Sequence, residues 1–160
     1  MTTIQSETLT TQVDAVAFEL DDLRCAISTQ PVVEILRAVA YRPIAGQPPF
    51  VPGVIDLRGT VIPLMDLRAR FGLRTHPLSP EHRFIVVNTH GRPIAIWVDR
   101  VLGILTYDPN SVLGSEGLIV GTRSFAGILR TPNSLVVIHD PAAFISESEL
   151  EALSEASLRT

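Results

Sequence analysis

The 160-residue sequence predicts a mainly β fold, in which two small barrels lie side by side and share an apolar seam. Short apolar runs rich in β-branched residues follow one another at close spacing, with turn residues between them. One strand–turn–strand unit also occurs twice at a fixed offset. The hydrophobic fraction is 46%, and halves of roughly 60 residues are near the size at which a separate core is marginal. We therefore expect the two halves to bury apolar faces against each other.

The clearest unit of the sequence runs from Phe50 to Gly72. Apolar runs on either side of Arg58-Gly59 predict a hairpin with Arg58 at its tip. Pro63 has no donor N–H, so we expect its strand at a sheet edge, or Pro63 facing out of the ladder. Asp66 is expected to cap a short helix that Gly72 ends.

The same unit returns later in the chain. The separation is 74 residues both from Gly53 to Gly127 and from Asp66 to Asp140, with no gap between the copies. In the second copy the turn is expected at residues 131–134, and a proline suits the first position of the helix after Asp140. We interpret the match as an internal duplication.

Turn residues divide the remaining chain into short segments. Val32 to Ile35 fits either a helical turn or a strand, because the apolar run is too short to show its period. Ser146 and Glu149 stand at capping-box spacing and predict the start of a helix. Five further strands are predicted at Val13–Leu20, Leu23–Ser28, Arg83–Thr89, Arg92–Val98 and Val101–Thr106.

Composition also suggests how the chain is organised. The first residues are rich in Thr and Ser and lack periodicity, which predicts a mobile leader. The predicted organisation is a leader at 1–12, a single domain at 13–145 with approximate halves 13–76 and 77–145, and a short acidic helix at 146–160.

The sequence contains no motif that calls for catalysis or metal binding. It has no HExxH, no phosphate-binding glycine loop and no G-x-S-x-G elbow. The four histidines are scattered and are expected to be solvated loop residues. Cys25 is the only cysteine and lies in an apolar strand pattern, which is typical of a core residue. We therefore predict no enzymatic activity, no cofactor and no metal.

Charge and hydropathy bear on partners and location. The formal net charge of −4 argues against a general nucleic-acid binder, whose affinity depends on neutralising phosphates. The N-terminus shows no cationic segment followed by an apolar core, and no apolar run reaches membrane-spanning length. We expect a soluble cytoplasmic protein.

Arginines gather around the first hairpin and its helix, at Arg58, Arg68, Arg70 and Arg74. They fit two interpretations, a solvated arginine-rich face or a protein-docking surface, since arginine is enriched at interface hot spots. Glu34 lies among apolar residues and is either an exposed charge on a buried segment or the acidic contact of a docking strip.

The run from Pro48 to Gly72, with its G-V-I-D-L-R-G-T-V-I-P-L-M-D-L-R core, resembles the signature of the CheW family of chemotaxis coupling proteins and CheW-like domains. The likeness extends over residues 13–145. It implies two five-stranded β-barrels and an adaptor without enzymatic activity. The adaptor would link the cytoplasmic tips of transmembrane chemoreceptors to the regulatory domain of a CheA-type histidine kinase, at membrane receptor arrays. Asp56 departs from the family pattern, which usually has Asn at this position.

The resemblance also implies where partners bind. An amphipathic receptor helix is expected in an apolar groove at the seam between the barrels. The residues that the resemblance assigns to receptor and kinase coupling are Val32, Glu34, Gly53 and Arg58, and from the second half Val98, Asp99 and Ile104.

Two other functions remain open from the sequence. One is an adaptor of the same fold in a chemotaxis-like pathway that controls surface motility or gene expression. The other is a small-barrel binder of ligands or oligonucleotides, against which the acidic charge and the 6% aromatic content weigh.

Overall fold

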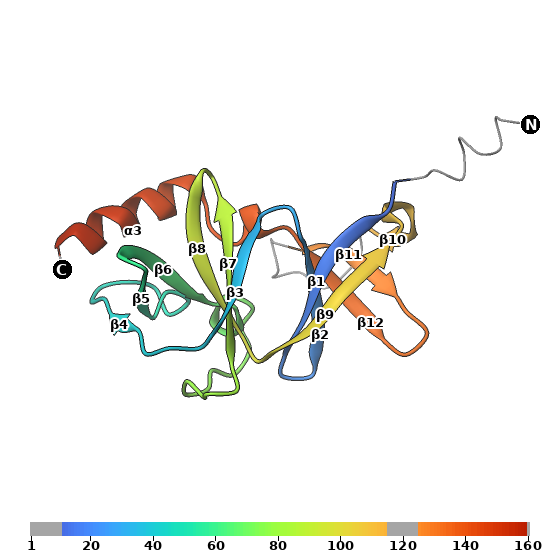
Figure 1. The fold of residues 1–160 in the computed structure, drawn as a ribbon, viewed down its shortest axis with the longest axis horizontal. Coiled ribbons are helices and arrows are strands. Elements are labelled where there is room, and N and C mark those ends of the chain that lie inside the picture. Colours follow the sequence, from blue (N-terminus) through green and yellow to red (C-terminus); the bar gives the residue numbers. More distant parts are fainter. Residues whose placement is uncertain (1–10, 115–124, 160) are drawn as a thin grey trace, which may run out of the picture.

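The structure, a computed structural model, describes residues 11–114 and 125–159. Two six-stranded sheets lie side by side along its long axis (Figure 1). We call the sheet that contains both ends of the domain the terminal sheet, with the order β10-β11-β12-β2-β1-β9, and the other the central sheet, with the order β3-β7-β8-β6-β5-β4. The mainly β fold with two subdomains is thereby confirmed.

The strands of the terminal sheet are β1 (Val13–Leu20), β2 (Leu23–Ser28), β9 (Arg100–Tyr107), β10 (Val112–Leu113), β11 (Phe125–Arg130) and β12 (Leu135–His139). Those of the central sheet are β3 (Val32–Arg37), β4 (Arg42–Pro43), β5 (Gly53–Leu57), β6 (Thr60–Asp66), β7 (Arg83–Thr89) and β8 (Arg92–Val98).

The two sheets share one pairing plan. Read from β4, the central sheet has the order β4-β5-β6-β8-β7-β3, and the terminal sheet has β10-β11-β12-β2-β1-β9. In both, the third and fourth strands pair in parallel and all other neighbours are antiparallel. The hairpin β1–β2 therefore takes the place in the terminal sheet that β7–β8 takes in the central sheet.

This arrangement exchanges strands between the expected halves. The half 13–76 contributes β1–β2 to the terminal sheet and β3–β6 to the central sheet. The half 77–145 contributes β7–β8 to the central sheet and β9–β12 to the terminal sheet. Each half therefore supplies strands to both sheets, so the two halves are interlocked.

The strand count differs from the expected five in each subdomain. Two-residue strands, β4 and β10, add a sixth strand at one edge of each sheet. β4 lies within a proline-rich stretch that shows no strand pattern in the sequence. Because proline has no N–H and can offer a ladder only its carbonyl group, such a stretch does not predict a strand. The ambiguous segment after Gln30 is resolved as a strand, β3.

The first hairpin has the predicted turn. Arg58 and Gly59 both adopt positive φ angles, 50° and 89°, which fit a two-residue hairpin turn. The Asp56 carboxylate accepts a hydrogen bond from the Gly59 N–H at 2.7 Å. Pro63 lies in an inner strand and not at an edge; the parallel ladder to β8 begins only at Leu64, so the missing N–H falls before it.

The predicted helix caps are present. The Asp66 carboxylate accepts the Arg68 N–H ahead of α2 (Leu67–Arg70), and the Asp140 carboxylate accepts the Ala142 N–H ahead of the 3-10 helix η2 (Pro141–Ala143). A further 3-10 turn, η1, spans Pro109–Ser111.

The C-terminal helix α3 (Glu147–Arg159) starts with a capping box, in which Ser146 and Glu149 exchange hydrogen bonds of 2.8 and 3.0 Å. It packs along β6 at the end of the central sheet (Figure 1). Of the expected leader and helix, residues 1–10 and residue 160 lie outside the described residues.

The largest core cluster joins the two sheets. Phe18 and Ile27 of the terminal sheet pack in one buried cluster with Ile85 and Ile96 of the central sheet, and with Phe144 before α3. Each sheet also has a smaller cluster of its own. The predicted shared apolar seam is thus the main core of the molecule.

Two expectations about polar residues were wrong. Arg68 is not part of a solvated arginine face, because its side chain has no exposed surface. His139 is not a solvated loop residue; it is buried and stacks on Phe71 with ring centroids 4.8 Å apart. His82 is also largely covered, with 13% of its side chain exposed.

Candidate protein-docking surface

An exposed ion pair joins two of the predicted coupling residues. Arg58, at the tip of the β5–β6 hairpin, binds the carboxylate of Glu34 in β3, and 70% of the Arg58 side chain remains exposed. In the central sheet β3 is an edge strand, and β7 and β8 separate it from β6. The sheet must therefore curl strongly to bring this hairpin tip over β3.

Exposed apolar side chains accompany this ion pair. Val33 and Ile35 precede and follow Glu34 in β3, where the alternation of a strand places their side chains on the opposite face, and they are 51% and 41% exposed. Val61 in the hairpin is 53% exposed. We call the set Val33, Glu34, Ile35, Arg58 and Val61 the Glu34–Arg58 surface. Large exposed apolar residues around a charged pair are typical of protein-docking sites rather than of solvated faces.

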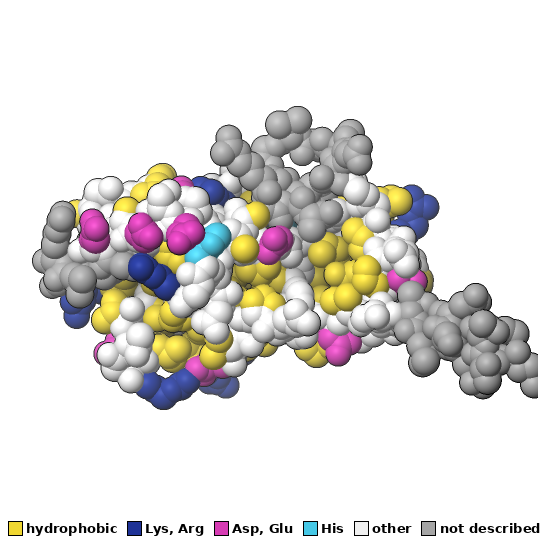
Figure 2. Space-filling view, turned by 90° about the horizontal axis from the view of Figure 1, so that it is seen from above, with side chains coloured by type: hydrophobic (Ala, Val, Ile, Leu, Met, Phe, Trp, Pro, Cys, Tyr) yellow, Lys and Arg dark blue, Asp and Glu magenta, His cyan; other side chains and the backbone are white. Residues whose placement is uncertain are grey.

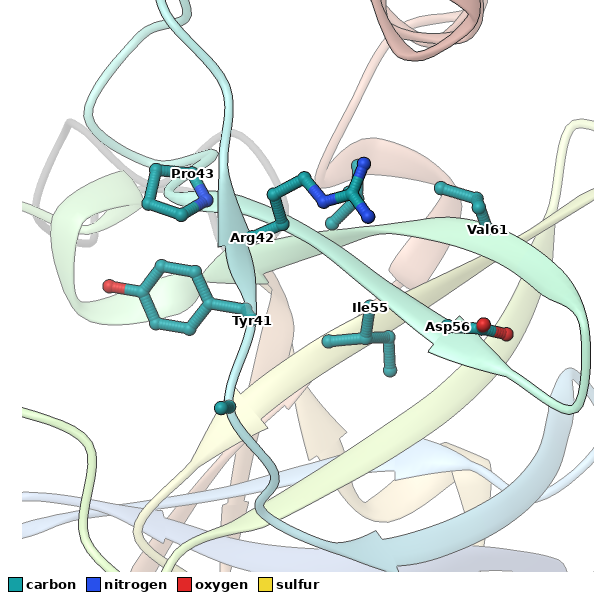
Figure 3. A pocket seen from close by; sticks show the side chains of 8 residues that line it. Tyr41, Arg42, Pro43, Ile55, Asp56 and Val61 are labelled. Atoms are coloured by element: carbon teal, nitrogen blue, oxygen red, sulfur yellow. The ribbon is translucent and has the colours of Figure 1, made fainter. Parts of the chain in front are cut away.

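A groove adjoins the Glu34–Arg58 surface at Val61. It has a volume of about 530 Å³ and is lined by the segment 40–43 and by residues of β5 and β6. Figure 3 shows the Arg42 side chain extending over β5 on the side where Val61 lies. Tyr41, Ile55 and Asp56 line the same groove. The docking region thus includes a concave part beside its exposed charged pair.

The terminal sheet carries a corresponding apolar surface. β9 occupies the place that β3 has in the central sheet, and it exposes Leu102 and Ile104 by 42% and 63%. Leu135 follows Val61 by 74 residues, the offset of the duplication, and is 54% exposed. We call Leu102 and Ile104 the β9 surface; Leu135 lies in β12, which β2 and β1 separate from β9. Hydrophobic side chains are exposed over both sheets on the face shown in Figure 2.

Not all predicted coupling residues are accessible. Val98 is fully buried in the shared core, and Val32 is a half-buried residue at its margin. Gly53 is buried, and a Cβ there would overlap the carbonyl oxygen of Arg42 in β4. Asp99 is 22% exposed, whereas Ile104 is one of the most exposed apolar residues described. The structure thus brings together Glu34 and Arg58 and leaves Ile104 on the other sheet.

A buried charged cluster, which no local sequence pattern predicts, lies between the sheets. The guanidinium of Arg68 forms ion pairs with Asp99 and, at 3.6 Å, with Asp66, and it lies 5.5 Å from the ring centroid of Trp97. Burial lowers the pKa of Arg68, and the charge of Asp66 opposes this shift. Burial raises the pKa of Asp66, and hydrogen bonding to Arg68 opposes it. In the sequence, burial of the Arg68 side chain could be predicted only from the presence of Asp66 and Asp99, the two carboxylates that pair with it.

His82 borders this cluster as a neutral imidazole. Its Nδ1 accepts hydrogen bonds from the Trp97 indole N–H at 2.9 Å and from the Ser79 N–H at 3.2 Å. Its Nε2 lies 3.8 Å from a carboxylate oxygen of Asp99. Burial lowers the pKa of His82, and the positive charge of Arg68 lowers it further. Two N–H donors aimed at Nδ1 explain why the ring stays unprotonated.

The boundary between the sheets has a hollow of about 390 Å³ on its surface. Glu81, Arg83, Arg100 and Val101 line it. Three of these four residues are charged, so this hollow does not match the apolar groove that the resemblance implies at the seam.

The described part of the chain offers little for catalysis. It contains no group of three or more His, Cys, Asp or Glu side chains placed to hold a metal ion. Cys25 is buried, and burial raises its pKa to about 12, so the reactive thiolate is negligible at neutral pH. Among the helices of residues 11–114 and 125–159, none is long and apolar enough to cross a membrane.

Comparison with known proteins agrees with this geometry. The chain is 27% identical over 149 residues to the chemotaxis protein CheW of Treponema pallidum, with 89% of this chain and 88% of that protein covered. It is 28% identical to the chemotaxis protein CheW of Rhizobium meliloti, with 87% and 91% covered.

A solved structure has the same fold. The scaffolding protein TtCheW from Thermoanaerobacter tengcongensis superposes with a TM-score of 0.79 at 27% identity, covering 85% of this chain and 94% of that chain. The family profile of the CheW-like domain matches residues 14–149. The chain therefore belongs to the CheW-like domain family.

Proposed function

We propose that this protein is a non-catalytic adaptor that couples transmembrane chemoreceptors to a CheA-type histidine kinase in chemotaxis signalling. The observation that carries the proposal is the Glu34–Arg58 ion pair, held on an exposed surface with apolar neighbours. A hairpin-tip arginine that is 70% exposed adds little to stability as an ion pair, but an arginine in such a setting suits a binding hot spot.

An adaptor needs at least two surfaces that partners can occupy together. The Glu34–Arg58 surface belongs to the central sheet and the β9 surface to the terminal sheet. Their presence on separate sheets supports simultaneous binding of the regulatory domain of the kinase and the cytoplasmic tip of a receptor. We infer a cytoplasmic location with recruitment to membrane receptor arrays, and no nucleic-acid partner, in keeping with the net charge of −4.

Names of the relatives also support the proposal. Several of them are chemotaxis proteins, and the structural neighbour is a scaffolding protein. An adaptor of the same fold in a pathway for surface motility or gene expression would carry the same surfaces and differ only in its partners.

The proposal is tested by reconstitution with purified components. The kinase regulatory domain and a receptor-tip fragment from the same organism are titrated into the protein separately and then in sequence. We expect each partner to bind alone and the second to bind the preformed complex with similar affinity. Binding of neither partner, while the protein melts cooperatively, would refute the proposal; competition between them would refute the two-surface arrangement.

A further inference from the structure

Asp99 occupies the crossover between the two sheets. It is the one residue between the end of β8 in the central sheet and the start of β9 in the terminal sheet. Its backbone N–H donates to the Glu19 carbonyl oxygen of β1 at 2.9 Å. The main chain thus passes from one sheet to the other through a single residue that is already hydrogen-bonded to the second sheet.

The side chain of Asp99 has partners on both sides of this crossover. One carboxylate oxygen pairs with the guanidinium of Arg68 in α2, which follows β6 of the central sheet. The other oxygen accepts the backbone N–H of Asp21, in the β1–β2 turn of the terminal sheet, at 2.5 Å. One carboxylate therefore ties together two elements that the chain places 47 residues apart.

The interaction with Arg68 is costly to break. Arg68 has no exposed side-chain surface, so removing its partner would leave a buried charge without full compensation. Asp66 cannot replace Asp99 in this role, because its carboxylate caps α2 and lies within the central subdomain itself. Of the two described acidic residues that form ion pairs with Arg68, only Asp99 is also hydrogen-bonded to the terminal sheet; the charge of Asp21, in the β1–β2 turn, acts on Arg68 without an ion pair.

We propose that Asp99 is a positioning residue that fixes the orientation of the two sheets, and with it the placement of the Glu34–Arg58 surface relative to the β9 surface. Substitution of Asp99 then alters binding through the angle between the surfaces, without any contact between Asp99 and a partner. The test below reads this orientation within the molecule, so its outcome does not depend on the proposed function.

The experiment measures the distance between the sheets by pulsed electron spin resonance. Spin labels are attached at Thr60→Cys on the central sheet and Asn133→Cys on the terminal sheet, two exposed positions, while buried Cys25 stays unlabelled. We compare the distance distribution of the parent with that of Asp99→Asn, which keeps the size of the side chain and an oxygen for the Asp21 N–H. Asp22→Asn, an exposed residue of the same turn, is the matched control.

A second variant separates orientation from charge burial. In Arg68→Met with Asp99→Asn the buried guanidinium is removed together with its Asp99 partner, and Asp66 keeps the backbone hydrogen bond that caps α2. The melting temperature should therefore recover part of the loss of about 10 °C expected for Asp99→Asn alone. We expect a narrow distribution in the parent and control, and a broadened or displaced one in both Asp99 variants.

A distribution with both the width and the mean distance of the parent in both Asp99 variants would overturn the proposal, because Asp99 would then serve only to neutralise Arg68. If the double variant does not fold, Asp99→Glu takes its place, since it keeps the charge and lengthens the side chain by one methylene. A displaced distance in Asp99→Glu would support the positioning role, and an unchanged distance would contradict it.

Discussion

Gly53 in β5 and Gly127 in β11 meet the same kind of neighbour, the main chain of a two-residue edge strand. A Cβ at Gly53 would overlap the Arg42 carbonyl oxygen, and a Cβ at Gly127 would overlap the Leu113 carbonyl oxygen. The two glycines are 74 residues apart, the offset at which the hairpin unit repeats. The duplication therefore preserves a close main-chain approach as well as a strand pattern.

Gly53→Ala should destabilise the fold, because the added methyl group forces β4 away from β5. We expect a loss of about 1–3 kcal/mol in the free energy of unfolding, measured by urea denaturation. Thr60→Ala, at an exposed position of the same hairpin, is the control and should stay within about 0.5 kcal/mol of the parent. A Gly53→Ala variant as stable as the parent would show that β4 moves freely.

The interlocked halves should not fold separately. A fragment of residues 1–76 contains β6 without its parallel partner β8, and β2 without its parallel partner β12. We expect poor amide dispersion and no cooperative melt for this fragment or for residues 77–160. An equimolar mixture of the two should regain dispersion, because each supplies the missing strands. Sharp melting of residues 1–76 alone would contradict the exchange of strands.

Stability should fall below neutral pH through His82. The pKa of folded His82 is lowered from its ordinary value of 6.5 by burial and by the nearby charges of Arg68 and His76, while Glu81 opposes the shift. The unfolded state therefore takes up the proton first. The His82 contribution is complete above pH 6.5 and is lost as the pH falls through the lowered pKa.

The only tryptophan reports this change directly. Protonation would place a hydrogen on His82 Nδ1, so this nitrogen could no longer accept the hydrogen bond from the indole N–H of Trp97. We expect the Trp97 fluorescence and the urea midpoint to change together between pH 7.5 and pH 5, as measured at matched ionic strength. His82→Gln should flatten both profiles, whereas His76→Gln, which removes one of the lesser causes of the lowered pKa, should keep the change and move it slightly toward higher pH. Equal profiles for the parent and His82→Gln would exclude this mechanism.

Local patterns in the sequence predicted much of the fold. The bounds of β1, β2, β7 and β8 follow from short apolar runs bounded by turn residues, and the Asp66 and Asp140 caps follow from the residues after each hairpin. The exchange of β1–β2 with β7–β8 depends on parallel pairing between distant strands, which leaves no local signal. β4 was missed because two residues, one of them proline, carry no period.

The candidate site was predictable in part, for a similar reason. The family resemblance indicates both Glu34 and Arg58, but only the curl of the central sheet brings their side chains into contact. The burial of Arg68 could not be read from its neighbours, because a charged residue is buried only where distant partners neutralise it, here Asp99.

The role of the Glu34–Arg58 surface is tested by reversing its charges. Arg58→Glu removes a permanent cation from an exposed tip, so the melting temperature should hardly change. Its affinity for the kinase regulatory domain or the receptor tip should fall at least about 30-fold, as expected for a hot spot worth roughly 2 kcal/mol. Glu34→Lys should behave in the same way. Arg130→Glu, on the corresponding hairpin of the terminal sheet, is the control and should bind as the parent does.

The most direct measurement is calorimetric titration of the charge-swapped variant, Glu34→Arg with Arg58→Glu, against both partners. The swap restores an ion pair between the two positions but presents each charge to a partner with the opposite sign. We predict a thermal melt like that of the parent together with a large loss of binding to at least one partner. Binding of both partners with the affinity of the parent would show that the pair acts only within the molecule, and would contradict the assignment of this surface as a docking site.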